Sequence, residues 1–465
     1  MVSRNVVSKY SRMYCRVRIP VLILKGIMAD LLSSRRRYRW QRSFHFSNRN
    51  TTNSTAPGVS ILRPLKGLDT NLYENLESTF NQKYPNYEII FSVADERDQA
   101  LPVIQALISR YPDIKVTVII GRSTLHAGIN SFLSYFLGEE IVGVNPKVNN
   151  LIRSFRAAAH DILWVLDSGV IVDSGTLARS VDILTTLPSS SRTPRSIALV
   201  HHVPLAIVNE PQVGSRLEAA FLNTNHAKMY IAINTVSIES CVVGKSNLYR
   251  RSDIDRLNAS LVPIRLQTAT FEPREHGLRA FGKYLAEDNM IASAIWHELG
   301  LRHDLSYDVA HNVIGNMSFS DYVWRRVRWI RVRKHMVLAA TVLEPFTESV
   351  VLSIIGSLCG RFLLNIPMWL FIILHFMLWL LLDLDVYTSL ANEKINSAFI
   401  LAWAAREVLA FPIWLLAIFG DEIVWRGQNY QVLKNGEAVL CMSQTSSVFS
   451  QWFSSLGKPQ HYHPI

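Results

Sequence analysis

Hydrophobic residues between 59 and 250 follow two alternating patterns. Short apolar runs predict strands over Val59–Leu62, Tyr87–Val93, Lys115–Ile120, Ile162–Leu166 and Ile197–His202, and Ser240–Leu248 is expected to cross back through the sheet. Apolar residues at helical spacing predict helices over Leu68–Asn81, Ala100–Arg110, Lys147–Ala159 and Gly214–Tyr230. Strands that alternate with helices are typical of a largely parallel sheet with helices on both faces. We therefore expect an α/β domain that binds ligands at the carboxyl ends of its strands.

The pattern changes after residue 338, where long stretches are almost entirely apolar. Phe362–Leu382 is 21 residues long without a formal charge, which is enough to span a bilayer. Ser349–Cys359 is apolar but shorter, and we expect it to be re-entrant or paired with its neighbours. Ser397–Gly420 is a further candidate, interrupted by Arg406 and Glu407. Such charges are costly at membrane depth unless they pair or face a cavity, and two or three membrane segments are expected.

These changes in composition divide the chain into four parts. They are a basic arm with a polar linker at 1–57, the α/β domain at 58–338, a membrane region at 339–425 and a polar tail at 426–465. Residues 122–138 interrupt the α/β domain, because they separate a strand from its helix by more than the usual few residues. They are interpreted as an inserted loop, an unspliced segment or a surface hairpin.

The net charge of +11 is concentrated in the first 50 residues, which contain twelve Lys and Arg against one Asp. A hydrophobic content of 49% and a mean hydropathy of +0.14 fit a chain that is part soluble and part membrane. A basic arm near a membrane favours anionic lipid headgroups, although a solvated tail has the same composition. No nucleic-acid module follows the arm, so nucleic acid is not an expected partner.

The four cysteines are Cys15, Cys241, Cys359 and Cys441, and no two of them form a Cys-x-x-Cys motif. This scattered arrangement fits a reducing compartment and argues against a zinc site.

Two carboxylates directly follow predicted strands. Asp95 could hydrogen-bond the base or ribose of a nucleotide, and Asp167 could bind a diphosphate through a metal ion. Many sugar transferases carry a second carboxylate two residues further on, where this chain has Gly169. A capping role for Asp95 and a turn role for Asp167 are the structural alternatives.

A third carboxylate and a basic cluster come later in the chain. Asp288 lies near the start of an apolar-periodic segment, where a rigid base could remove the proton of a hydroxyl acceptor. Arg325 and Arg328 share one helix face and could clamp a departing diphosphate, and Trp329 offers an aromatic wall. The alternatives are the usual preference for acids in a first helical turn and a juxtamembrane basic helix on lipid headgroups.

The order of these residues resembles the D, D, D, (Q/R)xxRW signature of inverting glycosyltransferases. Within that group the chain is most similar to the ceramide glucosyltransferase family, of the fungal type, from about residue 59 to residue 430. The matching stretches are Val59–Gly67, Gly143–Leu151, Asp167–Gly169, Ala286–Asp288 and Arg325–Trp329. The family itself has Asp-Ser-Gly at 167–169, so Gly169 departs only from the wider superfamily.

The resemblance implies a GT-A-like domain on the cytosolic face of a Golgi or ER/Golgi membrane, in a multi-pass protein. Its expected reaction is inverting transfer of glucose from UDP-glucose to the primary hydroxyl of ceramide. It implies a catalytic base at Asp288, a catalytic His201 from a Val-His-x-x-Pro pattern, and a divalent metal, Mg or Mn, at Asp167. The implied binding residues are Asp95 and Asp167, with Arg325 and Arg328, for the donor and Trp329 for the acceptor.

Two other functions share parts of this pattern. A processive polysaccharide synthase carries the same four-part signature, but it needs more spanning helices to build a channel. A non-catalytic or mis-spliced membrane protein is the other alternative, because the family's N-terminal spanning helix has no good counterpart here and 122–138 matches nothing in the family.

Overall fold

A computed structural model describes residues 56–121, 140–185, 196–264, 275–391, 395–425, 428–433 and 435–441. The predicted insertion at 122–138 and nearly all of the basic arm lie outside these residues.

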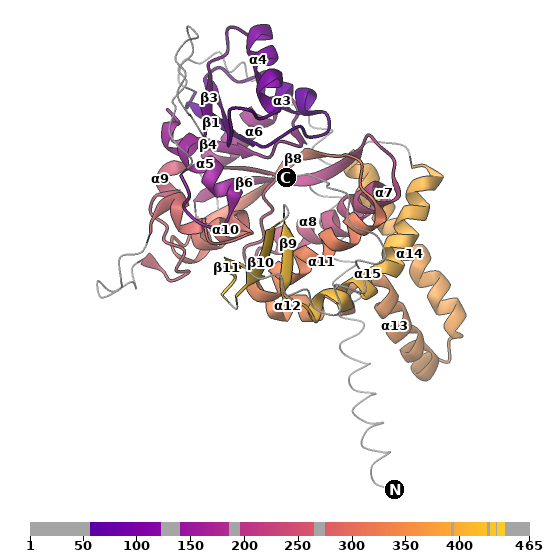
Figure 1. Cartoon of the computed structure of the whole chain (residues 1–465). Coiled ribbons are helices and arrows are strands. Elements are labelled where there is room, and N and C mark those ends of the chain that lie inside the picture. The colour runs from indigo at the N-terminus through magenta and orange to yellow at the C-terminus, as the bar shows by residue number, and fades with distance from the viewer. Residues whose placement is uncertain are drawn as a thin grey trace.

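An eight-stranded sheet forms the centre of the α/β domain (Figure 1). Its strand order is β3-β2-β1-β4-β7-β6-β8-β5. The first four strands in this order are mutually parallel, β7 runs antiparallel to both of its neighbours, and β6 pairs with β8 in parallel. The prediction of a largely parallel sheet is confirmed. The strands are β1 (Val59–Leu65), β2 (Tyr87–Val93), β3 (Val116–Ile120), β4 (Ile162–Leu166), β5 (Val170–Ile171), β6 (Ile197–Val208), β7 (Ser246–Arg250) and β8 (Arg302–Ile314).

Helices cover both faces of the sheet. Neighbouring residues of each strand point to opposite faces, and both faces carry apolar side chains that the helices bury. Ile61 of β1 packs into one buried cluster and Leu62 into the other. The first cluster includes the helices α3 (Leu72–Phe80), α4 (Ala100–Arg110) and α6 (Thr176–Thr185). The second includes α5 (Pro146–Ala157), α9 (Arg251–Ile254), the 3₁₀ helix η4 (Gly277–Phe281) and α10 (Glu287–His297).

The helix predicted over Gly214–Tyr230 is broken by a π-helical segment. It consists of α7 (Val213–Phe221), η2 (Leu222–His226) and α8 (Ala227–Val236). Within η2, the Asn223 side chain bonds both backbone groups of Ala206 on β6, at 2.7 and 2.9 Å. A π-helical turn accommodates an extra residue in a helix, and here that turn is fixed to the sheet.

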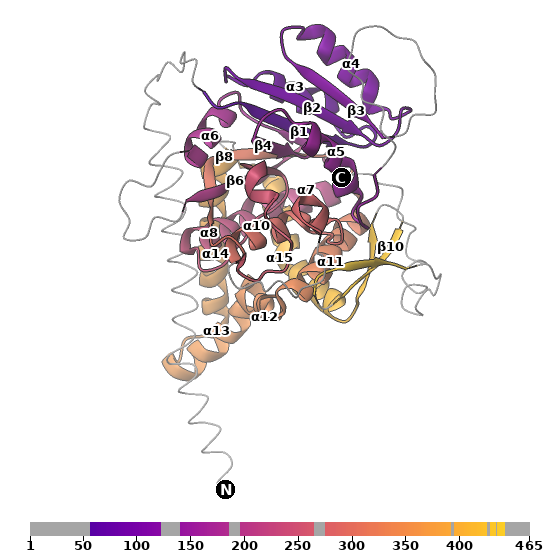
Figure 2. The ribbon, with the colours of Figure 1, turned by 90° about the vertical axis from the view of Figure 1, so that its left-hand side faces the viewer.

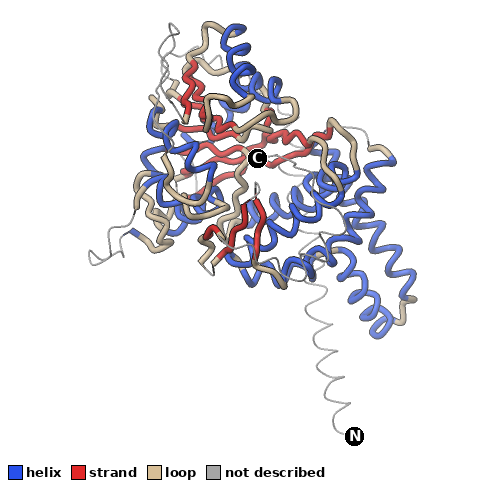
Figure 3. The backbone as a smooth tube through the Cα atoms, in the orientation of Figure 1, coloured by secondary structure: helices blue, strands red, loops and turns tan. Residues whose placement is uncertain are grey.

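The C-terminal helices group beside the sheet domain (Figure 3). They are α11 (Phe319–Met336), α12 (Leu338–Leu343), the 3₁₀ helix η5 (Glu344–Thr347), α13 (Ser349–Leu364), α14 (Met368–Ala391) and α15 (Ser397–Ile418). In the described residues α14 and α15 are long and apolar enough to cross a membrane, and the bent pair of Leu338–Thr347 and Ser349–Leu364 would make a third span. This agrees with the expected two or three segments.

The predicted span Phe362–Leu382 has the wrong boundaries. The α13 helix ends at Leu364, the next residue, Asn365, adopts a left-handed backbone, and α14 begins after Pro367. The left-handed Asn365 turns the chain out of α13, and Pro367, which lacks an N–H group, directly precedes α14. The apolar run is therefore divided between two helices. The two helices pack as a hairpin that projects away from the sheet (Figure 1 and Figure 2).

Arg406 and Glu407 are both 2% exposed and form a buried ionic cluster with η5 and α13. The Arg406 guanidinium contacts the carboxylate of Glu407 and lies 2.7 Å from that of Glu348. Ser349 donates to Glu407, and Asn225 donates to Glu348 at 3.0 Å. The two charges predicted at membrane depth therefore pair.

The segment predicted as a polar tail contributes to a second sheet. In it β9 (Glu422–Trp425), β10 (Gln428–Val432) and β11 (Ala438–Leu440) pair antiparallel. Its apolar side packs against Leu285, Ala286 and Val332, so the chain returns from the membrane helices to the start of α10.

Candidate active site

Asp167 follows β4 at the carboxyl edge of the sheet and is 6% exposed. Its two carboxylate oxygens each contact a lysine ammonium group, Lys147 at 2.8 Å and Lys245 at 3.1 Å. Burial alone would raise the pKa of Asp167, but the two ammonium groups outweigh it and hold the pKa below the ordinary value. Asp167 is therefore a carboxylate at neutral pH.

The buried guanidinium of Arg63 supports this edge from inside the sheet. It donates to the backbone oxygens of Asp167 at 3.0 Å and Val170 at 3.1 Å, and also to that of Asn75. Because these acceptors lie on either side of Ser168 and Gly169, Arg63 fixes the turn that presents the Asp167 carboxylate.

Lys147 joins Asp167 to the acids at the start of α10. Its ammonium group lies 3.0 Å from Glu287 and 3.3 Å from the backbone oxygen of Gly244. Burial lowers the pKa of Lys147, yet Asp167, Glu287 and Asp288 together raise it well above the ordinary value. The lysine is therefore always charged, and the three carboxylates surround it.

Asp288 is half-buried in the first turn of α10. Burial, followed by the neighbouring charge of Glu287, raises its pKa to about 7. Its carboxylate packs directly against the backbone of Gly244, where an added Cβ would lie 2.1 Å from Oδ2. A carboxylate with this pKa can accept a proton at neutral pH, which is what a general base requires.

Two asparagines, one capping α5 and one within it, hold the parts of the site together. Asn145 caps the helix through its side-chain oxygen, while its amide donates to the Tyr284 carbonyl at 2.7 Å and to Glu287 at 2.8 Å. Asn150 donates to the backbone oxygens of Leu65 and Ser92, near the ends of β1 and β2. Helix α5 therefore sets the position of Lys147 relative to both the sheet and α10.

Asp95 lies two residues beyond the end of β2, on the same edge of the sheet as Asp167. Asp95 is exposed. Among the described residues, its carboxylate accepts a hydrogen bond from the nearby backbone N–H of Arg97. The nearby Asp98 instead accepts the N–H of Gly67 with both oxygens at 2.9 Å. Asp98 fixes the loop, and Asp95 is left facing solvent.

The basic and aromatic residues predicted for the donor and acceptor lie on α11. Arg325 forms an ion pair of 2.9 Å with Glu218 of α7, which is 1% exposed. Trp329 is 38% exposed, and the Arg328 guanidinium lies 5.8 Å from the centre of its ring. In the described part of the chain, the ion-pair partner of Arg325 is therefore Glu218 and not Asp167 or Asp288.

His201 is fully buried in β6. Its ring nitrogens lie 2.5 Å from the Tyr230 hydroxyl and 3.2 Å from His303. The same Tyr230 oxygen accepts the N–H of Val243 at 3.0 Å, next to the glycine against which Asp288 packs. His201 is therefore linked to Asp288 through Tyr230 and the backbone, and this geometry suits a residue that positions others.

Sequence reasoning brought together Asp167 and Asp288 but assigned no role to Lys147, Lys245 or Glu287. Lys147 stood inside the matching stretch Gly143–Leu151, so a signal was present. No sequence pattern pointed to Lys245, because it reaches Asp167 only through the pairing of β4 with β7.

A metal at Asp167, as predicted, would share this carboxylate with two ammonium groups. Both oxygens of Asp167 contact ammonium groups, and the place of a second carboxylate is taken by Gly169. Among the described residues no group of three His, Cys, Asp or Glu side chains is placed to hold a metal ion.

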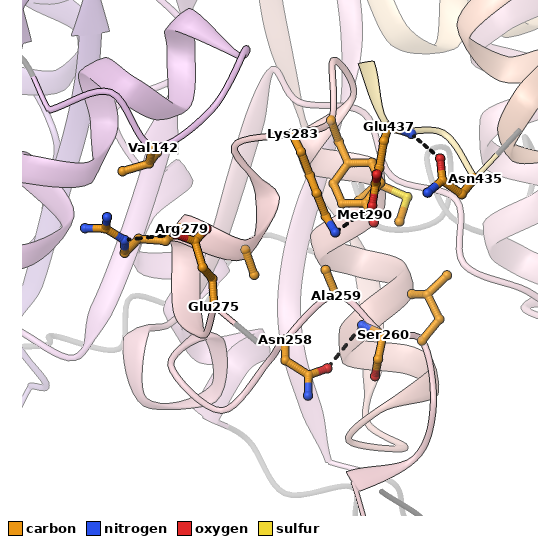
Figure 4. Close-up of a pocket in the computed structure, with 13 residues that line it drawn as sticks. Val142, Asn258, Ala259, Ser260, Glu275, Arg279, Lys283, Met290, Asn435 and Glu437 are labelled. Carbon is orange, nitrogen blue, oxygen red and sulfur yellow. Dashed lines mark hydrogen bonds and ion pairs between the residues drawn. The ribbon is translucent and has the colours of Figure 1, made fainter. Parts of the chain in front are cut away.

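A cavity of about 460 Å³ opens near the C-terminal sheet, beside η4 and α10 (Figure 4). Lys283 and Glu437 form an ion pair of 2.6 Å on its wall, near Asn435 and Met290. None of the three aspartates lines it, so it is separate from the carboxylate cluster.

Comparisons with known proteins relate the chain to glycosyltransferases. Ceramide glucosyltransferases from Komagataella phaffii and Candida albicans are 37% and 32% identical to it, over 81% of this chain and 82% and 87% of theirs. Ceramide glucosyltransferase 1 of Caenorhabditis elegans is 28% identical, over 82% of this chain and 73% of its own.

Among solved structures, a mannosyltransferase from Pyrobaculum calidifontis in complex with GDP-Man and Mn²⁺ matches 86% of this chain and 94% of its own, with 16% identity and a TM-score of 0.39. The sequence profile of glycosyl transferase family 21 matches residues 21–258 and 274–438, which is most of the chain. The chain belongs to glycosyl transferase family 21.

Proposed function

We propose that this chain transfers glucose from UDP-glucose to the primary hydroxyl of ceramide, with inversion, giving β-glucosylceramide. The observation that carries this proposal is the cluster at the carboxyl edge of the sheet, where Asp288 has a pKa of about 7 beside the Lys147-bridged pair of Asp167 and Glu287. The names of the relatives supply the acceptor and the sugar.

One in-line displacement accounts for inversion. The ceramide oxygen attacks the anomeric carbon of glucose while the bond from that carbon to the diphosphate breaks, and the hydroxyl proton passes to Asp288. UDP leaves with the bonding electrons. Asp167 stays ionised because two ammonium groups contact it, whereas burial raises the pKa of Asp288 to about 7, so Asp288 can exchange a proton near neutral pH.

We assign the uridine part to Asp95, which faces solvent on the donor edge of the sheet. Arg325 and Arg328 stabilise the charge of the leaving UDP in this proposal, and Trp329 lines the acceptor site. The ion pair with Glu218 holds Arg325 in place on α11. A divalent cation at Asp167 stays a prediction, and UDP binding measured in EDTA and again with Mn²⁺ or Mg²⁺ checks it.

The membrane helices provide a route for the acceptor. Apolar side chains of α13 and α14 such as Phe362, Trp369 and Leu381 are more than 60% exposed, which fits contact with lipid chains. Ceramide would then reach the site laterally without leaving the bilayer. We place the enzyme in a Golgi or ER/Golgi membrane, with the sheet domain on the cytosolic side, where the nucleotide sugar is present.

The rate of transfer should depend on the protonation of Asp288. Its folded pKa of about 7 means that the carboxyl is largely protonated, and unable to act as a base, below this value. We expect kcat/KM to rise with pH through about 7 and to fall about tenfold per pH unit on the acid side. Rates measured from pH 5 to 9 check this. A rate that stays constant down to pH 5 would contradict the assignment.

Gly244 should tolerate no side chain. An alanine Cβ would lie 2.1 Å from the Asp288 carboxylate and would displace it. We expect Gly244→Ala to lower kcat by roughly 100-fold, since a misplaced base loses most of its effect. Gly300→Ala is the control, because no atom lies within 4 Å of its added Cβ. Its backbone is left-handed as well, so a modest loss of stability is expected there, but no loss of kcat.

A panel of donors tests the proposed reaction. Membranes that contain the chain are incubated with ceramide and radiolabelled UDP-glucose, UDP-galactose or GDP-mannose, and the label is separated by lipid extraction. We expect extractable label from UDP-glucose above the other two donors. Label in an insoluble polymer would favour the polysaccharide synthase, and the absence of product from every donor would favour the non-catalytic alternative.

A further inference from the structure

Lys245 is a nearly buried cation whose binding capacity is largely unused. Its side chain is 15% exposed, and its ammonium group contacts Oδ2 of Asp167 at 3.1 Å. That is the only contact of this ammonium group with the described residues. An ammonium group has three N–H donors, so two of them remain available at the edge where the donor is proposed to bind.

Lys147 differs from Lys245 in this respect. Its ammonium group contacts Asp167 at 2.8 Å, Glu287 at 3.0 Å and the Gly244 carbonyl at 3.3 Å, which accounts for all three donors. Lys147 therefore neutralises the acids of the site and has no donor left for a ligand.

The fold fixes Lys245 in place from two sides. Leu166 of β4 pairs with Ser246 of β7, and the N–H of Asp167 donates to the Lys245 carbonyl at 3.2 Å, so the two residues face each other across the strands. Asp167 then holds the ammonium group through Oδ2, and burial of both partners strengthens the attraction.

We propose that Lys245 binds the diphosphate of the nucleotide-sugar donor and that Asp167 positions it. This inference rests on the proposed function and deepens it. The carboxylate contributes by holding a fixed cation, so part of the positive charge that the diphosphate requires is carried by the chain. Two N–H groups of one ammonium can reach oxygens of both phosphates, as charge-assisted hydrogen bonds.

Binding of UDP and of uridine to the purified full-length protein tests this role, because only UDP carries the diphosphate. Both affinities are measured by calorimetry in EDTA, and again with Mn²⁺ or Mg²⁺. The variants are Lys245→Met and Lys245→Arg, with Lys283→Met as the control, since Lys283 pairs with Glu437 beside the separate cavity.

In EDTA we expect the wild type to bind UDP more tightly than uridine. Lys245→Met should weaken UDP binding roughly 10- to 100-fold and leave uridine binding unchanged. Lys245→Arg should recover part of the loss, and Lys283→Met should match the wild type.

Three results would overturn the proposal. They are unchanged UDP binding in Lys245→Met, an equal loss for uridine, which indicates a structural role, and UDP binding that requires the metal and ignores Lys245. If the wild type binds GDP and guanosine in place of UDP and uridine, the proposed donor is wrong. The role of Lys245 is then judged on that pair by the same criteria.

Discussion

Replacing Asp288 by asparagine should strongly reduce the rate of glucosyl transfer while leaving donor binding intact. The amide has nearly the size of the carboxylate and fits the same place against Gly244, but it cannot accept the hydroxyl proton. Loss of a general base typically lowers rates 10²- to 10⁴-fold, and we expect kcat to fall within this range. The KM for the donor should change little, since Asp167 and the lysines keep their contacts.

Asp161→Asn is the matched control for this substitution. Asp161 accepts hydrogen bonds from Ser252 at 2.8 and 3.0 Å, on the exposed surface before β4, and should be dispensable for activity. Steady-state rates and UDP affinity are measured for both variants. If Asp288→Asn retains more than a tenth of the wild-type kcat, Asp288 is not the base.

The second large effect concerns stability. Arg406→Met removes the cation that compensates Glu348 and Glu407, which are 8% and 2% exposed. Breaking a buried ion pair by removing one partner costs about 3 to 5 kcal/mol, because the remaining charges stay uncompensated. We expect a large drop in the thermal midpoint of the detergent-solubilised protein.

A triple variant separates loss of charge compensation from loss of packing. Arg406→Met combined with Glu348→Gln and Glu407→Gln leaves no buried charge in the cluster, and we expect it to recover much of the lost stability. If the triple variant is no more stable than the single one, the cluster does not act through its charges.

The sheet domain was predictable because its strands are short, apolar and separated by amphipathic helices. β2 and α4 begin and end at the predicted residues. The π-helical segment was not predictable, since it depends on the contact of Asn223 with Ala206, far apart in sequence. The second sheet was missed because β10 is mostly polar and β11 has only three residues, and both are stabilised by packing against Leu285, Ala286 and Val332.

The site was predictable to the extent that its residues follow strands or begin a helix. Asp167 follows β4 and Asp288 lies in the first turn of α10, and the fold brings both carboxylates near Lys147. The role of Lys245 depends on strand pairing that no local pattern encodes. The role of His201 was predicted from the family resemblance alone. Its position at the end of a predicted strand did not indicate that it is fully buried against Tyr230 and His303.

The anomeric configuration of the lipid product tests the central proposal most directly. The purified protein is supplied with α-linked UDP-glucose and ceramide, and the product is examined by NMR. We expect a single β-linked glucose on the primary hydroxyl of ceramide, formed at least about 100-fold more slowly by Asp288→Asn. An α-linked product, a polymer, or unreduced synthesis by the variant would contradict inverting transfer with Asp288 as the base.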